Sequence, residues 1–222
     1  DGVEKSLTPA EMLSQVYEIE RDKGETISGV VLMGSGEPLD NYDNVLKFIK
    51  LINSKDGKNM GQRHITLSTC GLINKMYDLA DEELQITLAV SFHAPNDEIR
   101  NRLMPVSKAN PMDKLLEACR FYADKTKRRI TFEYSLIKGV NDSADNAKEL
   151  ASKLKGMLCH VNLIPINDVK EKDYVKSTNE TIKRFEDILL SRGIETTVRK
   201  SLGGDIDAAC GQLRKRYKDE MK

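Results

Sequence analysis

The sequence of 222 residues has few aromatic side chains and no excess of either charge. Tryptophan is absent, aromatic residues make up 5% of the chain, and 35 Lys and Arg are balanced by 35 Asp and Glu. Proteins that bind nucleic acid usually carry a basic excess, and those that bind single strands stack bases on aromatic rings. The composition therefore argues against a non-catalytic RNA-binding module. Any contact with nucleic acid has to rest on local basic patches or on missing segments.

Long apolar runs are also lacking. No stretch of about 18 apolar residues occurs, so a membrane span is not expected. The pattern of a secretory signal peptide is absent, and the sequence begins with Asp1 rather than with methionine. We expect a cytoplasmic protein of which this sequence is a piece.

Cysteine is scarce and widely spaced. The four residues are Cys70, Cys119, Cys159 and Cys210, and no two of them form a C-x-x-C pair. A self-contained cysteine metal site and a disulfide scaffold are therefore both disfavoured. The pattern is typical of reduced thiols in the cytoplasm. Cys119 and Cys159 lie in apolar patterns and are expected in the core.

Apolar runs and helical patterns alternate along the chain. Strands are expected at residues 27–33, 63–69, 86–93, 128–137, 160–166 and 195–201. Helices are expected at residues 9–23, 44–52, 72–80, 95–102, 110–125, 142–155 and 177–191. Near-continuous apolar strands favour a parallel sheet, in a doubly wound or barrel-like α/β fold. We expect one domain over residues 1–222.

Polar and glycine residues follow or end several of these strands. They are Gly34, Ser35, Gly36, Glu37, Ser68, Thr69, Cys70, Ser91, His93, Glu133, Ser135 and Asn167. Each has an ordinary alternative: a tight turn for the glycines, a helix cap for the serines, a structural hydrogen bond for the histidine. In parallel sheets, however, ligands bind at the carboxyl ends of the strands. Together the residues therefore predict a small-molecule pocket.

The chemistry of these polar residues at the strand ends restricts the kind of ligand that the pocket could bind. A phosphate-binding G-x-x-x-x-G-K-[ST] loop is absent. A carboxylate, serine hydroxyls and backbone groups at strand ends suit a ligand with both an ammonium and a carboxylate, such as an amino acid. Cys210 lies in a glycine-rich loop with small neighbours, Ala209 and Gly211. It is either an inert small side chain or an accessible nucleophile.

Several stretches resemble one known family. The stretches are GSGEPLDNYDNV, RHITLSTCG, SFHAPNDEIRNRLMP, FEYSLIKGVND, VNLIPIN and DIDAACGQL. In this order they resemble the RlmN/Cfr family of radical S-adenosylmethionine (SAM) RNA methyltransferases, over about residues 7–216. They are more similar to the RlmN branch, which methylates carbon 2 of adenine, than to the Cfr branch, which methylates carbon 8.

The resemblance implies a partial (β/α)6 radical SAM barrel. In the family, a C-x3-C-x2-C loop after the first strand holds a four-iron, four-sulfur (4Fe-4S) cluster, and this sequence contains no such loop. The resemblance therefore implies an incomplete barrel that lacks its first strand and the cluster ligands, so the chain alone is expected to be inactive. Residues 201–222 would form a terminal loop and tail.

The resemblance also implies roles for individual residues. The SAM-binding residues would be Gly36, Glu37, Ser68, Ser91, Phe92, His93 and Asn167. Glu37 would face the methionyl ammonium, and Cys210 would carry the methyl group as the catalytic residue. No residue here would bind metal. Ser35 and Cys70 differ from the usual family form, and Cys70 is interpreted as a packing residue.

The implied reaction uses two molecules of SAM. One methylates Cys210, and the other, bound to the cluster, yields a 5′-deoxyadenosyl radical that activates the methyl group for addition to the adenine. The implied partners are 23S ribosomal RNA, transfer RNA and a reductant such as flavodoxin or ferredoxin, with a monomer expected. Two alternatives stay open: a Cfr-type enzyme that confers ribosomal antibiotic resistance, and a cluster-free α/β-barrel enzyme acting on an amino-acid-like molecule.

Overall fold

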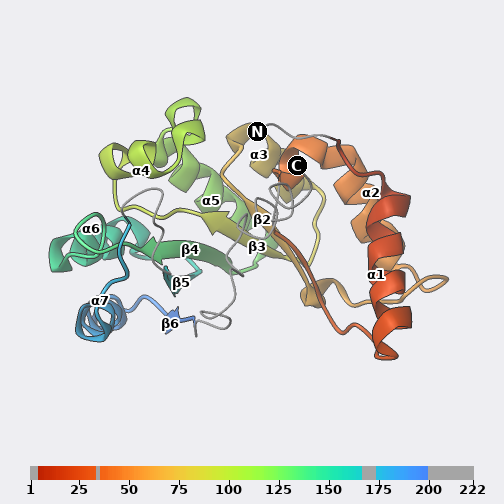
Figure 1. The fold of residues 1–222 in the computed structure, drawn as a ribbon. Coiled ribbons are helices and arrows are strands. Elements are labelled where there is room, and N and C mark those ends of the chain that lie inside the picture. The colour runs from red at the N-terminus through yellow and green to blue at the C-terminus, as the bar shows by residue number, and fades with distance from the viewer. Residues whose placement is uncertain (1–4, 34–35, 167–173, 200–222) are drawn as a thin grey trace.

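A computed structural model describes residues 5–33, 36–166 and 174–199 (Figure 1). These residues contain the strands β1 (Val30–Leu32), β2 (Ile65–Thr69), β3 (Thr87–Ser91), β4 (Ile130–Leu136), β5 (Cys159–Pro165) and β6 (Thr196–Val198). Their α-helices are α1 (Pro9–Lys23), α2 (Tyr42–Asn53), α3 (Ile73–Asp81), α4 (Asp97–Leu103), α5 (Met112–Thr126), α6 (Ala144–Leu154) and α7 (Asn179–Ser191). Short 3-10 helices lie at η1 (Pro38–Asn41), η2 (Gln62–His64) and η3 (Pro105–Ala109).

Each expected strand and α-helix is present, with shifts at the ends. The largest shift is in the first strand, which is expected at 27–33 and observed only at Val30–Leu32. The third strand is expected to reach His93 but ends at Ser91. It ends there because His93 adopts a left-handed φ of 58° and the N–H groups of Phe92 and His93 both donate to the carbonyl of Glu133. The sequence patterns do not predict the three 3-10 helices.

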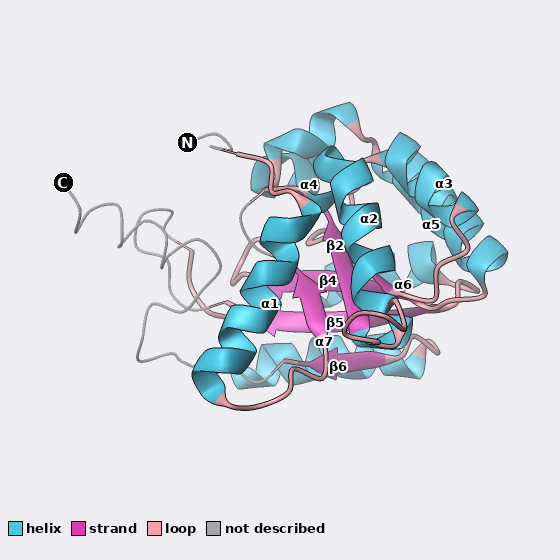
Figure 2. Cartoon of the chain, turned by 90° about the vertical axis from the view of Figure 1, so that its right-hand side faces the viewer, coloured by secondary structure: helices cyan, strands magenta, loops and turns pink. Residues whose placement is uncertain are grey.

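The six strands form one parallel sheet in the order β1-β2-β3-β4-β5-β6. Sequential order with a helical connection between neighbours is the arrangement of an α/β barrel wall rather than of a doubly wound sheet, whose strand order reverses. Figure 2 shows β2 standing nearly upright while β4, β5 and β6 run across the view, so the sheet is strongly twisted. The expected partial barrel is confirmed among the described residues.

The two faces of the sheet differ in chemistry because successive side chains alternate between them. On the outer face, apolar side chains such as Leu67, Val90, Phe132 and Leu163 belong to one buried core. The helices supply its other layer, with Phe185 of α7 fully within it. The other face, here called the inner face, carries Thr66, Ser68, Ala89, Ser91, Thr131, Glu133, Ser135, His160, Asn162 and Thr197.

Neighbouring helices pack in pairs outside the sheet. Contacts join α1 with α2, α3 with α5, and α6 with α7, as Figures 1 and 2 show. Local signals begin these helices: Thr8 opens α1 and Ser143 opens α6, each with a reciprocal capping box. In the part of the chain that the structure describes, no helix combines the length and the apolar character needed to cross a bilayer.

Candidate functional site

Glu37 connects the loops that follow β1 and β2. Its Oε1 accepts a hydrogen bond from the N–H of Leu39 at 3.0 Å, and its Oε2 accepts one from the N–H of Cys70 at 2.7 Å. The side chain is partly exposed, so each oxygen retains capacity for a further donor. Gly36 before it has φ 93°, a conformation that side chains rarely adopt. The two residues place an anchored carboxylate at the carboxyl end of β1.

Ser68 and Ser91 both face the inner side of the sheet. Ser68 lies beside Ala89 in the register of β2 and β3, and Ser91 lies beside Glu133 in the register of β3 and β4. Among the described residues neither hydroxyl has a hydrogen-bond partner. Free hydroxyls at adjacent strand ends are available to a ligand.

The Phe92 side chain faces away from the polar residues of the inner side. Its side chain is fully buried and meets Phe132 edge to face, with ring centroids 5.1 Å apart. Its N–H donates to the carbonyl of Glu133. A role in ligand binding is therefore restricted to its backbone carbonyl.

His93 is held by hydrogen bonds of both its backbone and its side chain. Its Nδ1 accepts the N–H of Ser135 at 3.1 Å, and its carbonyl accepts the Asn141 side-chain amide at 2.7 Å. Its own N–H donates to the Glu133 carbonyl. Burial, with a smaller contribution from the Arg100 cation, lowers the His93 pKa to about 4. The imidazole is thus neutral near pH 7, with its proton on Nε2.

Arg100 is a buried cation that the sequence did not single out. The side chain is fully buried, and its guanidinium donates to the carbonyls of Cys70 at 2.8 Å, Asn110 at 3.2 Å and Ser91 at 3.4 Å. No described carboxylate pairs with it, and its Nε has no partner. Because Cys70 also donates its N–H to Glu37, the ends of β1, β2 and β3 are connected through the backbone of one residue. The only signal in the sequence was its place in the helical stretch after His93.

Asn141 is a second buried residue that sequence reasoning missed. It is fully buried, donates to the carbonyls of His93 and Ser135, and accepts the N–H of Ile137 at 2.8 Å. The stretch FEYSLIKGVND that contains it was noted only for its family resemblance. Only the tertiary structure shows that the Asn141 amide reaches across to the end of β3.

A row of polar side chains crosses the inner face beside Ser91. In register, Ser91, Glu133, Asn162 and Thr197 are neighbours on four successive strands. Asn162 Nδ2 donates to Glu133 Oε2 at 2.9 Å. Glu133 is 7% exposed, and this burial raises its pKa, partly offset by the Asn162 bond. The row places a costly buried carboxylate at the centre of the sheet.

The cysteines in the described part of the chain are protonated thiols. Cys70, Cys119 and Cys159 are free, and burial raises the pKa of Cys70 to about 12 and that of Cys159 to about 11. Metal clusters are bound by thiolates. The described residues contain no group of three His, Cys, Asp or Glu that could hold a metal ion.

Four residues of the predicted site lie outside the described residues. They are Gly34, Ser35, Asn167 and Cys210. Their predicted roles stay predictions.

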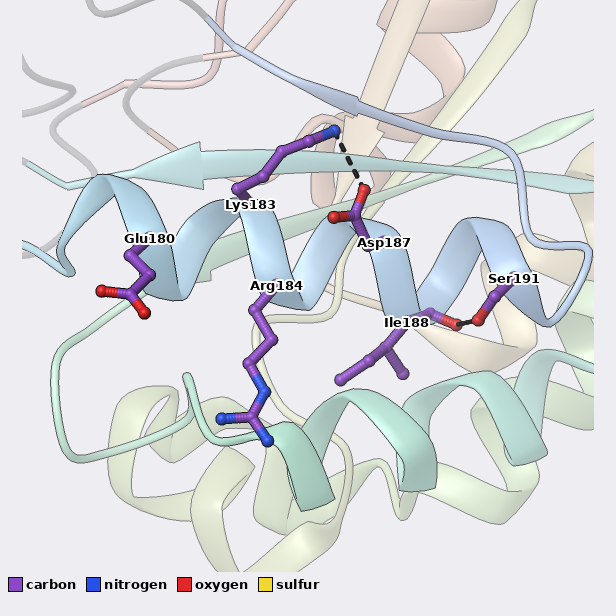
Figure 3. Close-up of a pocket in the computed structure, with 6 residues that line it drawn as sticks. All are labelled: Glu180, Lys183, Arg184, Asp187, Ile188 and Ser191. Carbon is purple, nitrogen blue, oxygen red and sulfur yellow. Dashed lines mark hydrogen bonds and ion pairs between the residues drawn. The ribbon is translucent and has the colours of Figure 1, made fainter.

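A surface hollow lies along α7, on the helical side of the sheet (Figure 3). It is lined by Glu180, Lys183, Arg184, Asp187, Ile188 and Ser191. Lys183 pairs with both Glu186 and Asp187 within the same helix. The hollow contains none of the predicted site residues.

The fold, with its parallel strands in sequential order and polar residues at their carboxyl ends, is one indication of the family. Similarity to known proteins is the other. A sequence model of the radical SAM superfamily matches residues 1–154. The chain belongs to the radical SAM superfamily. This membership confirms the predicted fold class. It also implies the predicted cofactors, SAM and a 4Fe-4S cluster.

Within this superfamily, the chain is similar to proteins described as probable dual-specificity RNA methyltransferase RlmN. The one from Clostridium novyi is 57% identical over 98% of this chain and 63% of its own length. The one from Clostridium tetani is 56% identical over 97% of this chain and 62% of its own length. These relatives confirm the resemblance that the motifs predicted. The chain spans less than two thirds of their length.

A solved radical SAM structure supports the fold. The crystal structure of a radical SAM methyltransferase from Sphaerobacter thermophilus has a TM-score of 0.89 and 48% identity to this chain. The match covers 95% of this chain and 63% of that one.

The two cofactors fit the described residues differently. SAM carries an ammonium, a carboxylate and an adenosine, and the inner side offers the Glu37 carboxylate and the free hydroxyls of Ser68 and Ser91 for such groups. The cluster needs thiolates, and the three described cysteines are separate, protonated and partly or wholly buried. The described residues therefore fit SAM and do not fit the cluster.

Proposed function

We propose that this chain is the SAM-binding part of a radical SAM RNA methyltransferase that acts on carbon 2 of adenine in 23S ribosomal RNA and transfer RNA. The observation that carries the proposal is 57% identity, over 98% of the chain, to a protein described as an RNA methyltransferase of the RlmN type. The polar inner side of the sheet supports it. The chain acts as one domain, in which residues 201–222 supply the terminal loop and tail.

The described residues of the proposed site divide between binding and positioning. Glu37 accepts the methionyl ammonium while its backbone bonds hold it in place. Ser68 and Ser91 supply hydroxyls to SAM. His93 stays neutral, so its Nε2–H is a donor at neutral pH.

Residues outside the described part complete the proposed chemistry. The Cys210 thiolate attacks the methyl carbon of SAM, a carbon–sulfur bond forms, the sulfonium–methyl bond breaks, and S-adenosylhomocysteine leaves. Asn167 contributes a further SAM contact. The 4Fe-4S cluster, held by ligands beyond the described residues, supplies reducing power when bound.

The proposed setting follows from this chemistry. The partners are 23S ribosomal RNA, transfer RNA and a reductant such as flavodoxin or ferredoxin, and the protein is a cytoplasmic monomer. The 222-residue chain alone is inactive, because no residue in it replaces three cluster thiolates.

Product analysis tests the proposal. The protein at its full natural length, with its cluster reconstituted, is incubated with SAM, reductant and unmodified ribosomal or transfer RNA, and the nucleosides are separated by mass spectrometry. 2-Methyladenosine is expected. With an intact cluster, 8-methyladenosine would replace the proposal by the Cfr-type alternative, and the absence of any methylated RNA would contradict the proposal.

Substitution of the methyl carrier sharpens this test. Cys210→Ala is expected to retain reductive SAM cleavage and to lose methylation, because cleavage needs the cluster and transfer needs the thiol. Cys159→Ala is the matched control, since this buried thiol lies in the wall of the sheet. Methylation that survives Cys210→Ala would contradict the assigned role.

A further inference from the structure

Glu133 is a buried carboxylate of the predicted pocket to which neither the family resemblance nor the comparisons assign a role. It faces the inner side of β4, between Ser91 of β3 and Asn162 of β5. Its backbone is fixed, because its carbonyl accepts the N–H groups of Phe92 and His93. The carboxylate therefore has a defined position in the sheet.

A chain of hydrogen bonds occupies one of its two oxygens. Asn162 Nδ2 donates to Glu133 Oε2 at 2.9 Å, and Thr197 Oγ1 donates to Asn162 Oδ1 at 3.5 Å. His160 Nε2 lies 2.9 Å from Thr197 Oγ1 and is the donor of this pair, because Thr197 gives its one hydrogen to Asn162. Burial, more than the nearby Arg129 cation, lowers the His160 pKa and favours the neutral ring. Every donor in the chain thus points toward Glu133, which fixes the orientation of the Asn162 amide.

The other oxygen has no partner in the described part of the chain. Glu133 is only 7% exposed, and its Oε1 accepts no hydrogen bond from the described residues but is not sealed from solvent. Arg199 attracts the carboxylate over a distance but forms no ion pair with it. A mostly buried carboxylate with one unpaired oxygen that solvent can reach is able to accept hydrogen bonds from a ligand.

We propose that Glu133 and Asn162 form a subsite for the hydrogen-bond donors of a nucleoside. The carboxylate accepts from the two hydroxyls of a ribose or from the amino group of an adenine, while Ser91 supplies a neighbouring hydroxyl. Carboxylates bind ribose hydroxyls in this way in dinucleotide sites. A cation suits the site less well, because the Arg199 charge already offsets that of the carboxylate. The subsite adds a ligand class to the proposed site, and its biological role rests on the proposed function.

Two nucleosides share this chemistry: the adenosine of SAM and an adenosine of the RNA. The test compares the natural full-length protein with Glu133→Gln, which keeps the shape and removes the charge. Glu195→Gln is the matched control, because Glu195 lies just before β6 at the opposite end of the strands and its carboxylate pairs with Arg129. The probes are adenosine, 2′,3′-dideoxyadenosine, SAM, methionine, and an RNA hairpin with one unpaired adenine or an abasic site in its place.

Glu133→Gln is expected to weaken nucleoside binding about tenfold or more, the effect of losing a hydrogen bond to a charged group. If the source is SAM, binding of SAM and adenosine weakens, binding of methionine does not change, and dideoxyadenosine binds both proteins equally weakly. If the source is RNA, SAM binding is unchanged and the preference for the adenine hairpin over the abasic one is lost. Either result supports the subsite.

A stability measurement separates a ligand-binding role from a structural one. Without ligand, Glu133→Gln is expected to unfold at a higher temperature than the unsubstituted protein at pH 8, because the buried charge is removed. Unchanged binding of every probe, or a lower unfolding temperature, would overturn the proposal. Failure to methylate RNA would count against the proposed function alone, because adenosine binding does not depend on turnover.

Discussion

At the residue scale, the backbone of Cys70 connects the ends of three strands through hydrogen bonds. Its N–H donates to Glu37 and its carbonyl accepts from Arg100, which also donates to the carbonyl of Ser91. The Arg100 guanidinium suits this position because its fork of donors reaches several carbonyls at once. Burying a cation without a carboxylate is costly, so the side chain is retained for the geometry that it sets.

Replacing Arg100 is expected to destabilise the fold. Arg100→Met removes the donors to the partly buried carbonyls of Cys70 and Asn110, and we expect the free energy of unfolding to fall by about 2–4 kcal/mol. Arg100→Lys retains a donor and should lose less. Urea unfolding measures both changes. The control is Arg102→Met, in the exposed last turn of α4, and an Arg100→Met protein as stable as this control would contradict the assigned contacts.

At the element scale, the turn between β2 and α3 is pressed against α5. Gly71 has φ 100°, and a Cβ atom at this position would lie 2.9 Å from Leu115 Cδ1 of α5. The connection from the end of β2 to α3 is therefore compatible only with glycine. The same packing holds the Cys70 peptide beside the site.

Gly71→Ala tests this packing. Backbone strain and overlap with Leu115 are together expected to lower the free energy of unfolding by about 2–4 kcal/mol. Gly156→Ala is the matched control, because Gly156 also has a positive φ (74°) but a Cβ atom there would meet nothing within 4 Å, so its loss should be about 1 kcal/mol from strain alone. Thermal or urea unfolding checks both, and equal losses would show that Leu115 does not restrict the turn.

At the scale of the whole molecule, the apolar core and the polar residues of the proposed site lie on opposite faces of the sheet. Its outer face and the helices form the apolar core, whereas its inner face carries the polar row and the proposed site. Buried titratable groups on the inner side, chiefly His93 and Glu133, connect the stability of the whole fold to pH.

The stability of the chain should fall as the pH is lowered from about 6.5 to 4. The His93 pKa is about 4 in the fold and 6.5 without the fold, so in this window the unfolded chain binds more protons. The loss from His93 is at most about 3 kcal/mol and is complete below pH 4. The contribution of Glu133 to the pH dependence of stability has the opposite sign. Because its pKa is raised in the fold, ionisation of Glu133 lowers the stability as the pH rises.

His93→Gln isolates the first effect. A glutamine oxygen can accept the N–H of Ser135, and this variant should unfold with a flatter dependence on pH between 6.5 and 4. Exposed His64→Gln, in η2, is the control and should keep the slope of the unsubstituted protein. Urea unfolding at a series of pH values measures the slopes. Identical slopes for His93→Gln and the unsubstituted protein would remove His93 as the cause.

The sequence by itself determined the elements, their order and the family. Apolar periodicity and caps such as Thr8 and Ser143 act within a few residues, so they can be read without the fold. The placement of Glu37, Ser68 and Ser91 at one edge of the sheet could be predicted for a related reason, because residues at the carboxyl ends of parallel strands reach the same edge.

Only the tertiary structure decided which polar groups share hydrogen bonds. The bonds from Arg100 to Cys70, from Asn141 to His93 and from Asn162 to Glu133 join residues 30, 48 and 29 positions apart. Strand register and helix packing create these pairs, and no local pattern encodes them. A role for the buried carboxylate of Glu133 can be inferred only when its neighbours in the sheet are known.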